Sequence, residues 1–298
     1  MRNRRHRARA ALALVVTALM TTAGCDAFGG GGGGTDSGAS ASRSAARHAP
    51  VWNRSPDSIA AVGDSITRGF DACTVLSDCP EVSWATGSDA KVDSLAVRLL
   101  GVTGAAERSW NYAVTGSRMA DLPEQMAQAA TRSPELVTVM VGANDACRSS
   151  ARAMTSVAGF RADFEEAMST LRAALPKTQV YVASVPNLKR LWSEGRGNPL
   201  GKQVWKLGIC PSMLRDADDL THAAAVRRDK VQLRVEAYNA VLKDVCAKDR
   251  RCRFDDNAVF DYDFDTEQLS HWDWFHPSRN GQARLAEIAY RTITAEKS

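Results

Sequence analysis

Residues 58–67 read SIAAVGDSIT and change from apolar to small and polar within a few positions. An apolar run that ends in Gly-Asp-Ser is typical of a buried strand followed by a tight turn, and it places Ser65 just past the tip of that strand. A serine hydroxyl is a weak nucleophile unless a neighbouring base takes its proton and nearby dipoles stabilise the charge that develops. The rest of the chain must therefore supply a base and hydrogen-bond donors if Ser65 is to react.

Three more apolar stretches end in small or polar residues in the same way: WNYAVTGS at 110–117, ELVTVMVGAND at 135–145 and TQVYVASVPN at 178–187. Helical patterns alternate with them. The patterns are an apolar stripe from Phe160 to Leu175, a second from Val231 to Val245, and the C-terminal stretch NGQARLAEIAYRTI. Strands that alternate with helices predict an α/β fold, here a three-layer α/β/α sandwich around a central, mostly parallel sheet.

In such sheets ligands bind outside the carboxyl ends of the strands. Ser65, Gly116 and Asn144 each follow an apolar run, so we expect them to meet at that edge. The segment 186–228 lacks clear periodicity and is too long for an idle connection. It is predicted to be a loop region that walls a substrate cleft.

The chain has 298 residues, of which 44% are hydrophobic and 24% charged, and residues 50–298 are long enough for one sizeable core. Its net charge of +4 comes from the leader, because five arginines lie within the first nine residues. The remainder is near neutral. A nucleic-acid-binding protein usually carries a basic face on its folded part, so this class is disfavoured.

The first 24 residues predict an export signal, with an arginine-rich start followed by AALALVVTALM, a run too short to span a membrane. The next residues, TTAGC, resemble a bacterial lipobox in which Cys25 is lipidated and anchors the mature protein to the membrane. The alternative is an ordinary secretory signal that is cut nearby. Residues 25–49 are a Gly/Ser-rich tether. We expect the protein to be exported, either to the outer face of the cell membrane as a lipoprotein or by secretion.

Apart from Cys25, the chain has six cysteines: Cys73, Cys79, Cys147, Cys210, Cys246 and Cys252. An even number in an exported chain predicts disulfides, for which six cysteines allow fifteen pairings. Two pairs that are close in sequence, 73 with 79 and 246 with 252, suggest local loops. A zinc site is the alternative, but the chain has no Cys-x-x-Cys and no histidine near a cysteine at ligand spacing.

Four short motifs occur along the chain: GDSIT with Ser65, NYAVTGSR with Gly116, VGAND with Asn144, and DWFH with Asp273 and His276. Together and in this order they resemble the motifs of the SGNH hydrolases, also called GDSL esterases/lipases. The six cysteines and the long 186–228 segment are similar to the secreted bacterial branch of that family, which includes three-disulfide lipases.

The resemblance implies an SGNH hydrolase domain at residues 50–298 with a flavodoxin-like fold, and disulfides Cys73–Cys79, Cys147–Cys210 and Cys246–Cys252. It implies that Ser65 is the nucleophile, His276 its general base and Asp273 the residue that orients the imidazole. The oxyanion hole would be the N–H groups of Ser65 and Gly116 and the amide of Asn144. We also expect the Ser65 N–H to lie at a helix N-terminus, where the helix dipole favours an anion.

The substrate that the resemblance favours is an acyl ester, such as a lipid, cleaved by a monomer without metal or cofactor. A carbohydrate O-deacetylase is the alternative within the family. A non-catalytic, ligand-binding lipoprotein is the alternative from another class.

Individual residues have simpler interpretations. Ser65 could cap a helix, Asp64 and Asp145 could stabilise turns, and His271 competes with His276 for the role of base. The spacing Asp-x-x-His favours His276. A metal site at Asp273 and His276 would need further ligands, which the sequence does not offer at a recognisable spacing.

Overall fold

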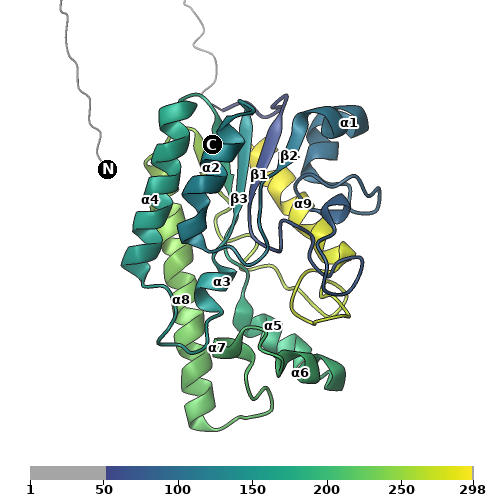
Figure 1. The fold of residues 1–298 in the computed structure, drawn as a ribbon, viewed down its shortest axis with the longest axis vertical. Coiled ribbons are helices and arrows are strands. Elements are labelled where there is room, and N and C mark those ends of the chain that lie inside the picture. Colours follow the sequence, from purple (N-terminus) through teal and green to yellow (C-terminus); the bar gives the residue numbers. More distant parts are fainter. Residues whose placement is uncertain (1–51, 297–298) are drawn as a thin grey trace, which may run out of the picture. The chain divides into compact units, whose positions relative to one another are not determined.

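The computed structural model describes residues 52–296. Its centre is a parallel sheet of five strands in the order β2-β1-β3-β4-β5 (Figure 1). The strands are β1 (Ile59–Gly63), β2 (Ser109–Asn111), β3 (Leu136–Met140), β4 (Gln179–Val182) and β5 (Cys252–Phe254). Because all four neighbouring pairs are parallel, the carboxyl ends of the strands lie along one edge.

Both faces of the sheet are covered, and this explains why the inner strands β1 and β3 are buried along their whole length and mostly apolar. All residues of β1 and β3 are buried. Successive side chains point to opposite faces. Accordingly, Val62 joins one apolar core and Ile59 joins the other.

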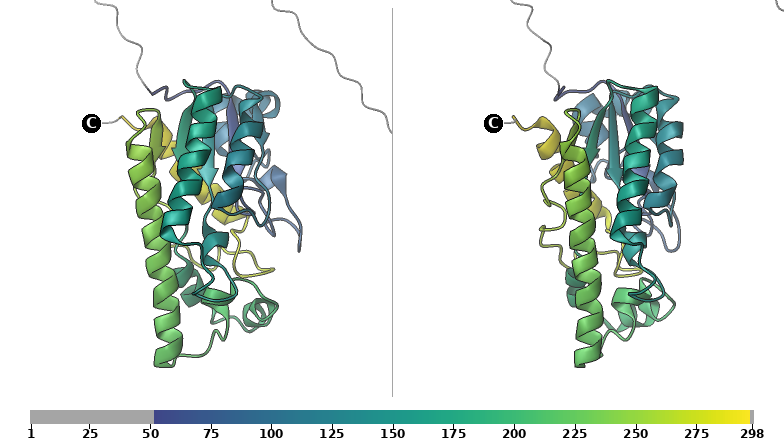
Figure 2. Two further views of the ribbon diagram at one scale, coloured as in Figure 1. Left: turned by 60° about the vertical axis from the view of Figure 1, so that its left-hand side comes forward. Right: turned by 90° about the vertical axis from the view of Figure 1, so that its left-hand side faces the viewer.

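Three helices cover one face of the sheet and two cover the other (Figure 2). The first set is α2 (Leu122–Ala130), α4 (Val157–Ala174) and α8 (His222–Ala247), and the second is α1 (Leu95–Arg108) and α9 (Arg279–Thr294). The shorter elements are α3 (Ala143–Ala146), α5 (Leu188–Gly195), α6 (Pro199–Trp205), α7 (Pro211–Leu214) and the 3₁₀ turns η1 (Pro80–Val82) and η2 (Met119–Asp121). The three-layer α/β/α sandwich expected from the sequence is therefore confirmed.

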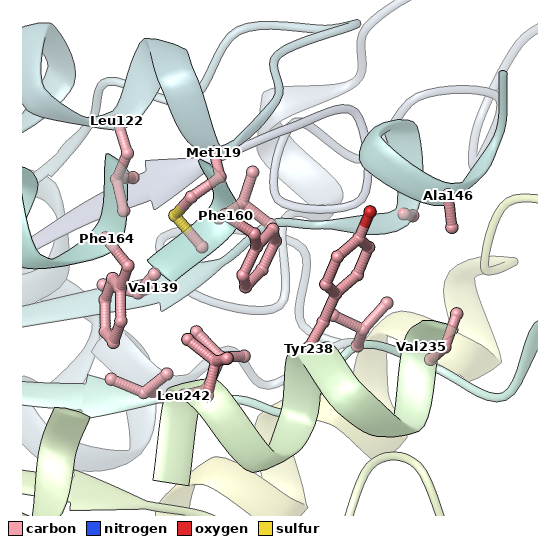
Figure 3. Close-up of a cluster of buried hydrophobic side chains, with 14 of the residues drawn as sticks. Met119, Leu122, Val139, Ala146, Phe160, Phe164, Val235, Tyr238 and Leu242 are labelled. Carbon is pink, nitrogen blue, oxygen red and sulfur yellow. The ribbon is translucent and has the colours of Figure 1, made fainter. Parts of the chain in front are cut away.

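The two apolar stripes in the sequence meet in the larger core, between α4 and α8 (Figure 3). There the rings of Phe160 and Tyr238 stack with their centroids 4.0 Å apart. Phe164 and Leu242 are also fully buried in this cluster. The stripes predict these two helices because side chains three and four residues apart share one helical face.

Two parts of the fold differ from the prediction. Strand β5 is not predicted from the sequence, because its three residues are too few for a periodic signal. The segment 186–228 is not a loop region, since it holds α5, α6, α7 and the start of α8. Helices α5, α6 and α7, of 8, 7 and 4 residues, are too short to display a full apolar stripe. Two of them are marked instead by asparagine caps, because the side chains of Asn187 and Asn198 accept N–H groups of the first turns of α5 and α6.

The six cysteines of residues 52–296 form the three disulfides Cys73–Cys79, Cys147–Cys210 and Cys246–Cys252. These are the pairs that the family resemblance implied, and they leave none of the six as a zinc ligand. Two of the bridges close loops with a sequence separation of 6, whereas Cys147–Cys210 spans 63 residues and joins the end of α3 to the start of α7.

The predicted export signal at 1–24, Cys25 and the tether at 25–49 lie outside the described residues. Within residues 52–296, no helix combines the length and the apolar character that crossing a bilayer requires.

We predict that removing the Cys147–Cys210 bridge costs more stability than removing a local bridge, because a disulfide restricts the unfolded chain more when it encloses more residues. For sequence separations of 63 and 6, the chain-entropy relation gives losses of about 4 and about 2 kcal/mol. Equilibrium urea unfolding of the double variants Cys147→Ala/Cys210→Ala and Cys246→Ala/Cys252→Ala measures the two losses. Equal losses would contradict the expectation.

Candidate active site

Ser65 lies two residues beyond the end of β1, and the direction in which the chain leaves β1 is tightly constrained. Gly63, the last residue of β1, has a φ of 147°, and a Cβ there would lie 2.1 Å from the carbonyl oxygen of Met140 on β3. Only glycine permits this approach. The side chain of Gln125 on α2 holds the same residue, accepting the Gly63 N–H at 2.7 Å and donating to its carbonyl oxygen at 3.0 Å.

The predicted helix after Ser65 is absent, and residues 64–71 form a bend and successive turns instead. The Phe70 N–H donates to the Ser65 carbonyl oxygen at 3.0 Å, and the Gly69 N–H donates to that of Ile66 at 3.2 Å. Gly69 and Asp71 have φ values of 64° and 57°, in the left-handed region, which a right-handed helix cannot continue through. Ser65 is therefore surrounded by individual peptide dipoles and not by the end of a helix.

His276 is presented by a tight loop between residues 268 and 278, just before α9. The Ser278 N–H donates to the Gln268 carbonyl oxygen at 2.8 Å, which closes the loop. Across it, the Ser270 N–H donates to the His276 carbonyl oxygen at 2.7 Å. The backbone at His276 is thus fixed independently of its side chain.

A continuous chain of hydrogen bonds joins Ser65, His276 and Asp273. The Nε2 atom of His276 lies 2.8 Å from Ser65 Oγ, and its Nδ1 atom lies 2.5 Å from Asp273 Oδ2. The other carboxylate oxygen of Asp273 accepts the N–H groups of Phe275 and His276, each at 2.9 Å. The carboxylate is therefore held by backbone on one side and by the imidazole on the other.

The electrostatics of this pair favour a charged imidazolium. Burial by itself would lower the pKa of His276, but the nearby carboxylates, Asp273 first, raise it above its ordinary value. Burial would likewise raise the pKa of Asp273, but the charge and hydrogen bonds of His276 and the two backbone donors keep it below its ordinary value. Each group thus stabilises the charged form of the other.

The competing histidine, His271, lies away from this chain of hydrogen bonds. It is exposed, and its ring packs on Trp272 with the centroids 4.3 Å apart. Of these two histidines, only His276 contacts Ser65 and Asp273.

Three donors are available at the sheet edge near Ser65. Among residues 52–296, the N–H groups of Ser65 and Gly116 donate to no protein acceptor. Gly116 is exposed, and no atom lies within 4 Å of the position that a Cβ would take, so a ligand can approach its backbone. Asn144 donates one amide hydrogen to the Ser117 carbonyl oxygen at 2.9 Å, which leaves the second free.

Two neighbouring aspartates stabilise turns, as the sequence suggested. Asp64 is buried, which raises its pKa to about 7, and it accepts the Ile66 N–H at 3.0 Å. Asp145 accepts the Met119 N–H at 2.8 Å and the Thr155 hydroxyl at 2.7 Å.

Two buried glutamines that the sequence did not single out form hydrogen bonds to the backbone next to Ser65. Gln125 fixes Gly63 and also donates to the Ser117 hydroxyl at 3.0 Å. Gln282, on α9, donates to the Ile66 carbonyl oxygen at 2.8 Å. The available signal was a glutamine within a buried helical stripe, a position where an unpaired amide would be costly.

Asp71 was also missed, and it brings a third titratable group to the pair. A carboxylate oxygen of Asp71, one of Asp273 and a ring nitrogen of His276 all lie within 4.8 Å of one another. The three could offer donors to a cation. However, His276 Nδ1 and Asp273 Oδ2 already bond to each other, so a cation would have to break that bond. The three side chains are therefore better suited to binding and transferring protons than to binding a cation.

An apolar cavity lies beside the site and is lined by its immediate neighbours in sequence. These are Ile66, which follows Ser65, Ala143, which precedes Asn144, and Phe275, which precedes His276. The Phe275 ring, which lines the cavity, packs edge-on against the His276 ring with centroids 5.0 Å apart. The free volume is about 30 Å³.

Helix α5 and the segment 262–264 form one wall of this cavity. Arg190 joins them, because its guanidinium donates to the Phe264 carbonyl oxygen at 3.2 Å and pairs with Asp263 at 2.7 Å. Leu191, on the same helix, faces the cavity. One side chain, Arg190, therefore links the two segments through a hydrogen bond and an ion pair.

Residues 59–289 match the model of the family described as GDSL-like lipase/acylhydrolase. No curated protein matches the chain. Among solved structures, phospholipase A1 from Streptomyces albidoflavus NA297 is 18% identical, with 80% of this chain and 100% of that chain covered and a TM-score of 0.45.

The extracellular lipase from Streptomyces rimosus is 16% identical, with 80% and 99% covered and a TM-score of 0.43. A family two carbohydrate esterase from Clostridium thermocellum, solved with cellohexaose, is 15% identical, with 79% and 63% covered and a TM-score of 0.46. Likenesses this distant say nothing about the substrate of this chain. The family match spans the sheet, Ser65 and His276, and the chain therefore belongs to the GDSL-like lipase/acylhydrolase family and is a carboxylic ester hydrolase.

Proposed function

We propose that Ser65, His276 and Asp273 form the catalytic triad of this ester hydrolase, which works through an acyl-serine intermediate. The observation that carries the proposal is the unbroken chain of hydrogen bonds from Ser65 Oγ through both ring nitrogens of His276 to Asp273, at 2.8 and 2.5 Å. A neutral imidazole in this position can take the serine proton while the oxygen attacks.

The reaction proceeds in two halves. Ser65 Oγ attacks the ester carbonyl carbon, His276 Nε2 takes its proton, and the resulting imidazolium gives that proton to the departing alcohol. Water then attacks the acyl-serine with His276 again as base, which releases the acid and restores Ser65. Asp273 fixes the tautomer with hydrogen on Nδ1 and stabilises the imidazolium in both halves.

Negative charge builds on the carbonyl oxygen in each tetrahedral intermediate. We assign the oxyanion hole to the N–H groups of Ser65 and Gly116 and to the free amide hydrogen of Asn144. Two observations support this assignment: the two backbone donors have no protein acceptor among residues 52–296, and Gly116 leaves open space for a ligand. Loss of one such donor typically costs about 10²–10³ in rate.

The substrate is proposed to be an ester with an apolar acyl group, as in a lipid. The apolar cavity beside the site supports this, because its lining includes residues adjacent in sequence to Ser65, Asn144 and His276. A free volume of about 30 Å³ exceeds the space of one water but is far too small for a long chain. Longer acyl groups would enter only if Arg190 breaks its contacts with Asp263 and Phe264 and the two segments that it links move apart.

We further propose that the domain works outside the cytoplasm, exported by residues 1–24 and held by a lipid on Cys25. Three disulfides within residues 52–296 support export, since such bonds persist in oxidising compartments. We propose that the enzyme acts as a monomer.

Replacing Ser65 or His276 by alanine should reduce kcat by roughly 10⁴-fold or more, because the two side chains act as one unit. The matched control is His271→Ala, which removes the neighbouring exposed histidine and should leave kcat within about threefold. Hydrolysis of nitrophenyl acetate and labelling with a fluorophosphonate, mapped by peptide mass spectrometry, provide the readouts. Full activity in Ser65→Ala, or an adduct on another serine, would refute the triad.

The kcat/KM of the enzyme should rise with pH along an acid limb centred above pH 6.5, the ordinary pKa of histidine. His276 must be neutral to accept a proton, and the carboxylates around it raise its pKa, so a higher pH is needed to free it. Initial rates on a nitrophenyl ester between pH 4 and 9 measure the limb. A limb centred below 6.5, or a flat profile, would count against the assignment.

Filling the cavity should change the preference for acyl length. In Leu191→Trp, we expect kcat/KM for nitrophenyl octanoate to fall about tenfold or more relative to the acetate, since each buried methylene is worth roughly 1 kcal/mol or more in such a pocket. Leu200→Trp, at an exposed leucine on α6, is the control. An unchanged octanoate-to-acetate ratio would place the acyl chain elsewhere.

A further inference from the structure

Asp71 is a buried carboxyl group to which the proposed reaction gives no role. Its residue is only 2% exposed, although it lies in the loop 69–79 that follows the Ser65 turn. The loop is closed by Cys73–Cys79 and by the Asp71 N–H, which donates to the Ser77 carbonyl oxygen at 3.0 Å. The Asp71 side chain accepts the Leu76 N–H. Covalent and hydrogen bonds thus hold this carboxyl in one place.

The loop is packed directly against the loop of His276. The Ser270 hydroxyl donates to the Asp71 carbonyl oxygen at 2.6 Å. The ring of Phe70 lies 4.9 Å from the ring of His276. As a result the Asp71 carboxyl reaches the Asp273–His276 pair, with donor atoms of all three residues within 4.8 Å.

Two carboxyl groups this close cannot both ionise at low cost, so one of them retains a proton to a higher pH. Asp273 has His276 and two backbone N–H donors, which favour its charged form. Burial and the adjacent Asp273 raise the pKa of Asp71 to about 6. The retained proton therefore resides on Asp71.

We propose that Asp71 is a positioning residue for ester hydrolysis: a second carboxyl group behind the triad that binds Asp273 when protonated and adds a second negative charge facing the imidazole when ionised. This inference rests on the proposed triad. Above about pH 6, the imidazolium that forms during each proton transfer faces two carboxylates, Asp273 and Asp71. Below that pH, it faces only one of these.

One more titratable group faces the imidazole. Asp64 is buried, acts on His276 through its charge and has Asp145 as a charged neighbour. It is attached to the Ser65 turn and not to the loop 69–79. A substitution at Asp71 alone therefore leaves the contribution of Asp64 in place.

The test is Asp71→Asn. Asparagine tolerates the left-handed backbone of residue 71 and can still accept the Leu76 N–H and donate to Asp273, but it cannot ionise. The ratio of wild-type to variant kcat/KM on a nitrophenyl ester should be near one at pH 5, where Asp71 is protonated. It should rise to about 3–10-fold at pH 8, as expected for a change of about one pKa unit at the imidazole. The acid limb of the variant should also shift to lower pH.

Asp256→Asn is the matched control, because Asp256 also has a left-handed backbone (φ 51°) but is exposed and paired with Lys243. Its ratio to wild type should stay near one at every pH. Unfolding midpoints in urea check that both variants fold.

A ratio for Asp71→Asn that is the same at pH 5 and pH 8 would overturn the proposal, since a merely structural role lowers activity equally at all pH values. Ser65→Ala is assayed alongside to test the triad separately. If Ser65→Ala is inactive and the Asp71→Asn ratio does not change with pH, the triad stands and only the role of Asp71 is rejected. A second variant, Cys73→Ala/Cys79→Ala, releases the loop that holds Asp71. If the position of Asp71 matters, the acid limb of this variant should likewise shift to lower pH, and the ratio of wild-type to variant kcat/KM should again rise from pH 5 to pH 8.

Discussion

The contact between Gly63 and the carbonyl oxygen of Met140 is the constraint on which the site depends. It ends β1, an inner strand of the sheet, against its neighbour β3 with no room for a side chain. Gln125 then holds both peptide groups of Gly63 and the hydroxyl of Ser117. One buried glutamine thus connects the Ser65 turn to the loop that carries Gly116. A larger residue at position 63 would have to displace the middle of the sheet, which is far stiffer than a loop.

A surplus of buried acids around a single imidazole is the second organising feature. Asp64, Asp71 and Asp273 all act on His276, and their burial makes full ionisation costly. Burial raises the pKa of Asp64 to about 7, and burial with the adjacent Asp273 raises that of Asp71 to about 6, so both carboxyl groups titrate close to neutral pH. Carboxylates around the imidazole stabilise its positively charged form. In a serine hydrolase this charge develops during proton transfer from the serine, so the stabilisation acts at that step.

Ser65 and His276 lie in turns and loops, and two of the three disulfides within residues 52–296 hold segments close to them. Cys73–Cys79 closes the loop of Asp71, and Cys147–Cys210 begins three residues after Asn144 and ties α3 to α7. The sheet positions the site at one edge, while the disulfides restrict loops that would otherwise be the most mobile parts of the domain. The short helices at 188–214 add an apolar wall, and Arg190 links this wall to residues 263 and 264 by polar contacts.

Local patterns in the sequence determined the α/β class, four of the five strands and the long helices α4, α8 and α9. Hydrophobic periodicity and strand-to-turn transitions are properties of neighbouring residues, so no tertiary information is needed to read them. The short motifs likewise singled out Ser65 and His276, which the structure brings within hydrogen-bond distance across 211 residues of sequence.

Only the tertiary structure decided the remaining features. Residues 252–254 become a strand by pairing with β4, and the turns after Ser65 replace a helix because Gly69 and Asp71 adopt left-handed φ values. Gln125 meets Gly63 from 62 positions away, and Asp71 meets a pair of residues some two hundred positions later. Their roles arise from contacts between distant segments. A buried polar residue must exchange water for protein partners, and which partners it meets depends on the packing of the whole chain.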